Sequence, residues 1–151
     1  MPEKQIVSVF RQQLDDAAAK IDRKLYYPYY SFKADCTVST LLGKKSVSVT
    51  CLVDALNGVG ATAERLSADR LKVGADSILQ VDVAPDEAVR TARRMLMHQL
   101  SRRLRMISDF GIELESLGLA YKCFWVARSS DMTLMIDSVT GCTHPLRTRA
   151  A

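Results

Sequence analysis

The sequence has no long hydrophobic run and no leader-like start. No stretch of the 151 residues approaches the roughly 18 apolar residues that a membrane-spanning helix needs. The first residues lack a charged region followed by an apolar one, which is the pattern of a secretory signal. We therefore expect a cytoplasmic protein with no membrane partner.

The motifs of common catalytic and cofactor sites are also missing. The four cysteines contain no Cys-x-x-Cys pair, so the usual zinc and redox spacings are absent. Neither Gly-x-Gly-x-x-Gly nor a phosphate-binding loop with Gly-Lys-Ser/Thr occurs, and no Gly-x-Ser-x-Gly elbow is present. We expect no metal, no cofactor and no catalytic residue.

The cysteines are better explained as strand residues. A hairpin turn at Gly43–Lys44 would place Cys36 directly opposite Cys51 on the neighbouring strand. Both are expected to remain free thiols in a reducing compartment. Cys142 and His144 stand at alternating positions without a third orienting group, so a catalytic dyad is the weaker interpretation.

The chain suits one domain, residues 1–151, that contains two helices. Apolar residues recur at steps of three and four over residues 3–24, which predicts an amphipathic helix. A second helix is predicted over residues 86–109, because Pro85 suits the first helical position and Gly111 follows the end.

Segments rich in β-branched and aromatic residues follow each helix. Strands are predicted over residues 25–36, 46–54, 59–66, 119–128 and 132–138, with a further short strand at 78–83. Residues 67–77 are predicted to form a loop, and residues 129–131 a hairpin turn. Pro28 cannot donate to a ladder, so it should lie at an edge, a bulge or a strand start.

Two parts of the chain resemble each other. An aromatic segment at residues 25–30 leads to Asp54 and Gly58, and a second one at residues 119–125 leads to Asp137 and Gly141. These patterns predict two repeated helix-strand-strand units, at about residues 3–66 and 85–146. The expected fold class is α+β, with two helices on one face of an antiparallel sheet of four to six strands.

The second unit resembles PepSY-type modules, whose helix-hairpin units commonly end on an Asp-x-x-Thr-Gly turn like residues 137–141. The resemblance covers about 60 residues loosely and depends on this one motif. It implies a non-catalytic module that binds or restrains other proteins. An aspartate and a glycine that close a short turn are also ordinary hairpin chemistry.

The predicted second helix has a basic face. On a 100° projection, Arg90, Arg94, His98, Arg102 and Arg105 fall within an arc of about 120°. This face is opposite the apolar stripe and suits single-stranded nucleic acid or an acidic partner, although arginine is also an ordinary solubilising residue. Arg103 projects into the apolar arc, so it should be buried and meet a carboxylate, a carbonyl or a ligand.

The aromatic strand supplies the favoured hypothesis for function. Tyr27 and Tyr29 project to the face opposite Tyr30, so the core cannot accept all of these phenols. We expect a non-enzymatic binding or adaptor module that uses Tyr27, Tyr29, Tyr30 and Arg103. Its partner would be another protein or a second copy at an open sheet edge. Nucleic acid binding through Arg90, Arg94 and Arg102 is one alternative, and a small enzyme of unknown reaction is the other.

Overall fold

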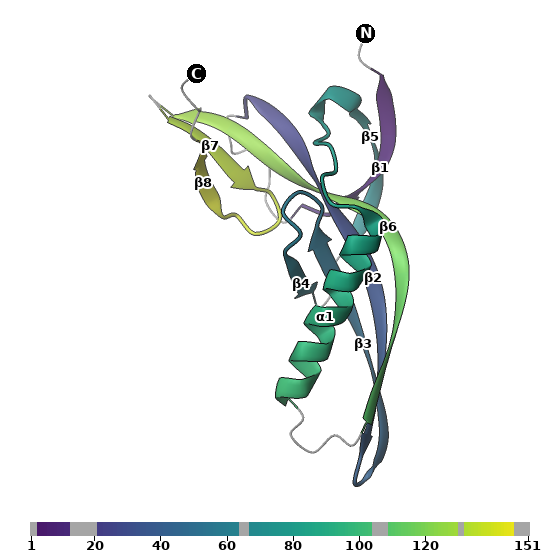
Figure 1. Ribbon diagram of the computed structural model, residues 1–151. Coiled ribbons are helices and arrows are strands. Elements are labelled where there is room, and N and C mark those ends of the chain that lie inside the picture. The colour runs from purple at the N-terminus through teal and green to yellow at the C-terminus, as the bar shows by residue number, and fades with distance from the viewer. Residues whose placement is uncertain (1–2, 13–20, 64–66, 104–108, 130–131, 147–151) are drawn as a thin grey trace. The chain divides into compact units, whose positions relative to one another are not determined.

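The computed structural model describes residues 3–12, 21–63, 67–103, 109–129 and 132–146. Within these ranges the chain is mostly β-structure, with eight strands in one mixed sheet and one α-helix (Figure 1). The strands are β1 (Lys4–Phe10), β2 (Arg23–Thr40), β3 (Gly43–Asp54), β4 (Gly60–Ala63), β5 (Ala68–Gly74), β6 (Asp109–Ser129), β7 (Met132–Asp137) and β8 (Thr143–Leu146). The helix α1 is Pro85–Arg103, and Ala75–Ser77 form a 3-10 turn. Hydrogen-bonded neighbours follow the order β4-β3-β2-β6-β1-β5, and β7 pairs with both β6 and β8.

The predicted fold class is wrong. The sheet is larger than expected and is mixed, since β1 runs parallel to β6 at the pair Val9 and Tyr121. The first predicted helix is contradicted at β1, where all seven residues pair with β5. Its apolar residues fit a helical period, but tertiary pairing with the predicted loop at 67–77 decides for a strand. Residues 13–20 of that predicted helix lie outside the described residues.

The chain packs as two compact units that each combine several segments. The first unit comprises Met1–Pro28, Leu66–Gln80 and Ala120–Ala151. The second unit comprises Tyr29–Arg65 and Val81–Leu119. The long strands β2 and β6 contribute residues to both units, so each unit draws on both halves of the sequence.

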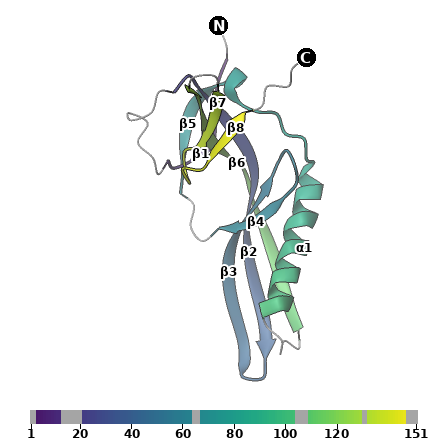
Figure 2. The ribbon, with the colours of Figure 1, turned by 90° about the vertical axis from the view of Figure 1, so that its left-hand side faces the viewer.

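The core of the second unit lies between α1 and one face of β2 and β3 (Figure 2). Even-numbered residues of β2 from Tyr30 to Val38 are buried, and their odd-numbered neighbours Lys33, Asp35 and Thr37 are exposed. This alternation is that of a strand with one covered face. The cluster contains Tyr30, Phe32, Ala34, Cys36, Cys51, Val53, Ala55, Val83, Ala88, Ala92 and Leu96.

The hairpin of the second unit has a different register from the predicted one. Thr40 pairs with Gly43, so Leu41 and Leu42 form the turn, in place of Gly43 and Lys44. Cys51 is therefore opposite Phe32, and Cys36 is opposite Val47. The two thiols belong to one core cluster on adjacent strands, but they do not face each other across the ladder.

The first unit has its own small core. Val9, Tyr121, Cys123 and Trp125 are buried together, and Tyr26 and Ile136 pack against them. The predicted hairpin of β6 and β7 is present, with Ser129 paired to Met132, so Ser129 belongs to the strand and not to the predicted turn, whose residues 130–131 lie outside the described residues. The 3-10 turn at Ala75–Ser77 follows β5, and the Ala75 amide donates to the Glu3 carbonyl at 2.8 Å.

We expect Leu96→Ala to lower the free energy of unfolding by about 2–5 kcal/mol, because Leu96 is 2% exposed at the centre of the helix-sheet core. The neighbouring substitution Met97→Ala is the control. Met97 is 45% exposed, so its loss should change stability by no more than about 0.5 kcal/mol. Urea unfolding of both variants measures the difference, and equal effects would contradict the described packing of α1.

Candidate functional site

Helix α1 has a buried apolar face and an exposed basic face. Ala88, Ala92 and Leu96 follow at steps of four and are all buried against the sheet. Arg90, Arg94 and the later residues His98 and Arg102 lie on the exposed side. Because residues on a helix are about 100° apart, burial of the first series turns the second toward solvent. The basic face predicted from the sequence is thus present and exposed at these four residues.

The basic face borders an open cleft of about 500 Å³. The cleft is lined by Arg90, Arg93, Arg94, Met97, His98 and Ser101. The Arg93 guanidinium reaches strand β6, where Nη1 donates to the Ile112 carbonyl at 3.2 Å. This bond fixes one edge of the cleft beside the sheet, and the remaining Arg93 N–H groups stay available as donors.

The arginines of the cleft lack carboxylate partners in the part of the chain that the structure describes. Arg11 pairs with Asp69 and Lys122 pairs with Asp137, but no ion pair is described for the arginines of the cleft. The acidic residues of the helix, Asp86 and Glu87, stand in its first turn, where they complement the helix dipole. The rest of α1 therefore presents a positive surface.

Arg103 is the last residue of α1. Its side chain lies outside the described residues, as do Arg105 and the rest of residues 104–108. Burial of Arg103 against a carboxylate or carbonyl therefore stays a prediction.

The structure removes one tyrosine from the expected binding surface. Tyr30 is 8% exposed within the core, and its hydroxyl donates to the Val83 carbonyl at 2.6 Å. Tyr27 is half-buried, and its ring meets Phe124 edge-on with the centroids 5.7 Å apart. Tyr29 is also half-buried. Tyr27 and Tyr29 are thus each only partly exposed, and they belong to different compact units.

The buried cysteines are poor nucleophiles. Burial, with a further contribution from the Cys36 thiol, raises the pKa of Cys51 to about 11. Burial and then Asp35 raise the pKa of Cys36. Since the thiolate is the reactive form, both cysteines remain protonated and unreactive near neutral pH.

Cys142 and His144 lie where β8 begins, and both are exposed. The Cys142 amide donates to the Thr140 hydroxyl, and its carbonyl accepts from the Asp137 amide. No hydrogen bond joins the thiol to the imidazole within the described ranges, and no group of three potential metal ligands converges there. The structure thus brings neither residue into a described cluster of reactive groups.

The two aspartate turns share one hydrogen-bond pattern. Asp54 Oδ1 accepts from the amides of the residues two and three positions later, at 2.8 and 3.1 Å. Asp137 Oδ1 does the same at 2.9 and 3.1 Å. Each turn ends at a glycine with positive φ, 77° at Gly58 and 80° at Gly141. The aspartates thus have a local structural role, because they satisfy turn amides that no strand can pair.

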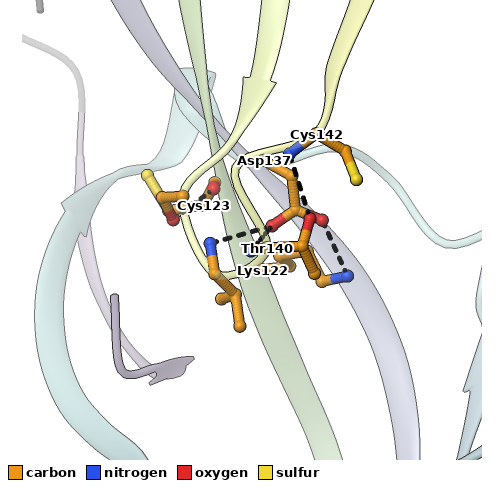
Figure 3. A network of polar contacts seen from close by, with 7 residues as sticks. Lys122, Cys123, Asp137, Thr140 and Cys142 are labelled. Atoms are coloured by element: carbon orange, nitrogen blue, oxygen red, sulfur yellow. Dashed lines mark hydrogen bonds and ion pairs between the residues drawn. The ribbon is translucent and has the colours of Figure 1, made fainter. Parts of the chain in front are cut away.

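The Asp137 turn carries an additional ion pair (Figure 3). Lys122 Nζ lies 3.1 Å from Asp137 Oδ2, and the aspartate side chain is only 8% exposed. Burial alone raises the pKa of Asp137, but the hydrogen bonds from the Val139 and Thr140 amides and the Lys122 ammonium outweigh it. Together they hold this pKa below its ordinary value.

No protein-family model, curated protein sequence or solved structure matches this chain. The resemblance of the second half to PepSY-type modules therefore stays a prediction. Among the described residues, no helix combines the length and apolar character required to cross a bilayer.

The Asp137 carboxylate should make stability depend on pH. Its folded-state pKa is lowered, so its contribution is present above the unfolded pKa of about 3.9 and is lost as pH falls through the folded value. At pH 7, Asp137→Asn should lower the free energy of unfolding by roughly 1–3 kcal/mol, because the amide loses the ion pair with Lys122.

Urea unfolding at pH 7 and at successively more acidic values measures this effect. The stability gap between parent and Asp137→Asn should shrink toward acid, where the parent carboxylate is protonated in both states. Glu115→Gln is the control, since it removes an exposed charge from β6 without touching the turn. A gap that stays constant over the whole pH range would refute the assignment.

Proposed function

We propose that this protein is a binding module whose helix α1 contacts the phosphate backbone of nucleic acid. The observation that carries this proposal is the open cleft lined by Arg90, Arg93, Arg94 and His98. The three arginines have no carboxylate partner among the described residues, so their charge is available to an external anion. A guanidinium binds phosphate oxygens in pairs and retains its charge at any physiological pH.

The spacing along the helix suits a repeating anion. Arg90 and Arg94 are four residues apart, which is about 6 Å along the axis at about 1.5 Å per residue. Arg102 continues the same face two turns later. Nucleic acid offers one charge per strand about every 3.4 Å, so several neighbouring phosphates lie within reach of this face. Contacts of this kind position a protein but do not read bases, so we expect little sequence preference.

The buried thiols support a binding function over a catalytic one. Cys36 and Cys51 are buried in the core, and burial raises the pKa of both thiols. Both therefore stay protonated, and neither supplies a nucleophile at the surface. The turn aspartates use their carboxylates to hold backbone amides, which leaves Asp137 in particular little capacity to act as a general base.

A protein partner bound through Tyr27 and Tyr29 is the alternative. Both residues are half-buried, so each remains partly accessible. Aromatic anchors of this type supply much of the energy at protein interfaces. The burial of Tyr30 weakens this alternative, because it leaves two of the three expected tyrosines at the surface.

We also infer that β2–β4 and β6–β8 are copies of one three-stranded unit. Asp54 pairs with the aromatic Tyr29, and Asp137 pairs with the aromatic Phe124. The residue before each aspartate pairs with the residue seven positions after it, in Val53–Gly60 and in Ile136–Thr143. The inference covers strands and turns only, because no described helix precedes β2.

If the two turns are equivalent, their central residues should be interchangeable. We expect the triple substitution Ser138→Ala, Val139→Leu and Thr140→Asn to lower stability by only about 1 kcal/mol, for the lost Ser138 hydroxyl bond to Cys123. The side-chain oxygen of the asparagine at position 140 can then accept from the backbone N–H of Cys142, as the Asn57 side-chain oxygen accepts from the N–H of Val59. Urea unfolding beside a triple-alanine control tests this, and a larger loss than in the control would contradict the equivalence.

Replacement of Arg90, Arg94 and Arg102 by alanine should weaken nucleic acid binding and flatten its salt dependence. Each lost phosphate contact reduces the slope of log affinity against log salt by about 0.7–0.9, so the triple variant should lose roughly two to three units of slope. Fluorescence anisotropy with labelled single-stranded and duplex DNA of mixed sequence, at several salt concentrations, measures both quantities. The fold should persist, since all three residues are exposed.

The control variant replaces Lys33, Arg70 and Arg128, which are exposed strand residues, and removes the same net charge. It should keep most of the parent affinity and slope. An equal loss in both variants would show that only net charge matters, and no binding by the parent even at low salt would overturn the proposal. Binding of a protein partner that depends on Tyr27 and Tyr29 would favour the alternative.

A further inference from the structure

The tip of the β2–β3 hairpin exposes two adjacent leucines. Leu41 is 85% exposed and Leu42 is 96% exposed, between the paired residues Thr40 and Gly43. Two-residue hairpin turns favour Asn, Asp and Gly, whose backbones accept the required conformations. Leucine has no such advantage, and at this position it contributes nothing to the core. Folding therefore does not explain why both turn residues are leucines.

Positive charge accompanies these leucines. Lys44 and Lys45 follow Gly43 on the other side of the turn, and both are exposed. Residues 36–47, the distal part of the hairpin, contain no aspartate or glutamate. The nearest carboxylate along the hairpin, Asp35, accepts from the Ser48 hydroxyl at 2.6 Å. The tip thus combines apolar side chains with uncompensated positive charge.

The tip is also sterically accessible within its unit. Figures 1 and 2 both show the β2–β3 hairpin continuing past the last turn of α1. Val38 is the last residue of β2 that is described as buried, and its partner Lys45 on β3 is exposed, as is Val47 at 49%. The segment beyond these residues can reach a flat surface without a clash from α1.

We propose that this hairpin tip inserts into the surface of an anionic lipid bilayer. Leu41 and Leu42 would enter the boundary between headgroups and acyl chains, and Lys44 and Lys45 would contact the lipid phosphates. Apolar residues beside basic ones are the pattern of proteins that lie on anionic membranes. The contact is peripheral, so it requires no spanning helix, and it uses residues other than the basic face of α1.

Self-association explains the tip less well. In a symmetric contact between two tips, Lys44 and Lys45 of each copy would face those of the other, and like charges repel. A leucine could instead enter the apolar cleft of about 180 Å³ near Cys36 and Leu100 of a second copy. Two leucine side chains bury far less than the roughly 1,200 Å² typical of a stable interface.

Co-sedimentation with phosphatidylcholine vesicles, with and without phosphatidylserine, tests the proposal. The parent protein should bind the anionic vesicles and not the zwitterionic ones. Leu41→Ser with Leu42→Ser should reduce the bound fraction to background. Lys44→Gln with Lys45→Gln should weaken binding by roughly 25-fold, since each lysine near an anionic surface is worth about fivefold.

The matched control is Ile6→Ser with Val59→Ser, which removes two exposed apolar side chains elsewhere and should bind like the parent. Urea unfolding of every variant should match the parent, because none of these side chains is buried. The proposal is overturned if the leucine variant binds as well as the parent. It is also overturned if vesicle binding is lost with Arg90, Arg94 and Arg102 but not with the leucines, which would assign the contact to the basic face.

Oligomeric state is measured in the absence of vesicles by sedimentation velocity. A monomer for both parent and leucine variant supports the membrane contact. A parent dimer that the leucine substitutions dissociate would overturn it in favour of self-association. Because nucleic acid binding is measured separately with the arginine variants, failure of this proposal and failure of the proposed function give different results.

Discussion

The packing of α1 on the sheet of the second unit is the constraint on which its surfaces depend. Ala88 and Ala92 present almost no side chain to the sheet, so the helix approaches it closely, and Leu96 fills the space beyond them. On β4, a Cβ at Gly60 would lie 2.9 Å from Met95 Sδ, which shows how close that approach is. Once this face is buried, helical geometry leaves the arginines no position except the solvent side.

The aspartate turns show a different kind of constraint, which is local. Each carboxylate holds two amides of its own turn, and each glycine adopts a backbone conformation that other residues rarely accept. Turns of this type form from a few neighbouring residues and require little help from the rest of the fold. The repeated turns therefore have a structural role rather than a reactive one, even though they are the most recognisable motif in the sequence.

Two surfaces of the second unit are not needed for its folding, and both are suited to anions. The outer face of α1 carries arginines without described partners, and the hairpin tip carries Lys44 and Lys45 beside two exposed leucines. They differ in chemistry, since the helix face is polar and extended whereas the tip is small and apolar. We propose a charged polymer as the partner of the first and a lipid surface as the partner of the second, and substitutions can test the two proposals separately.

The sequence by itself determined the features that depend on neighbouring residues: the start of α1 at Pro85, the exposed basic face, the pairing of β6 with β7 as a hairpin, and the two aspartate turns. Tertiary structure decided the rest. Residues Lys4–Phe10 fit a helical period, and only pairing with β5 makes them a strand.

The predicted and observed hairpin registers differ by an even number of residues, so both bury the same side chains and the hydrophobic pattern cannot distinguish them. The observed register ends at Tyr29, so Pro28 lies outside the ladder with β3, but it stands inside the interior strand β2 and not at the predicted edge or strand start. The burial of Tyr30 likewise depends on tertiary structure, because its hydroxyl donates to the carbonyl of Val83, which is distant in sequence.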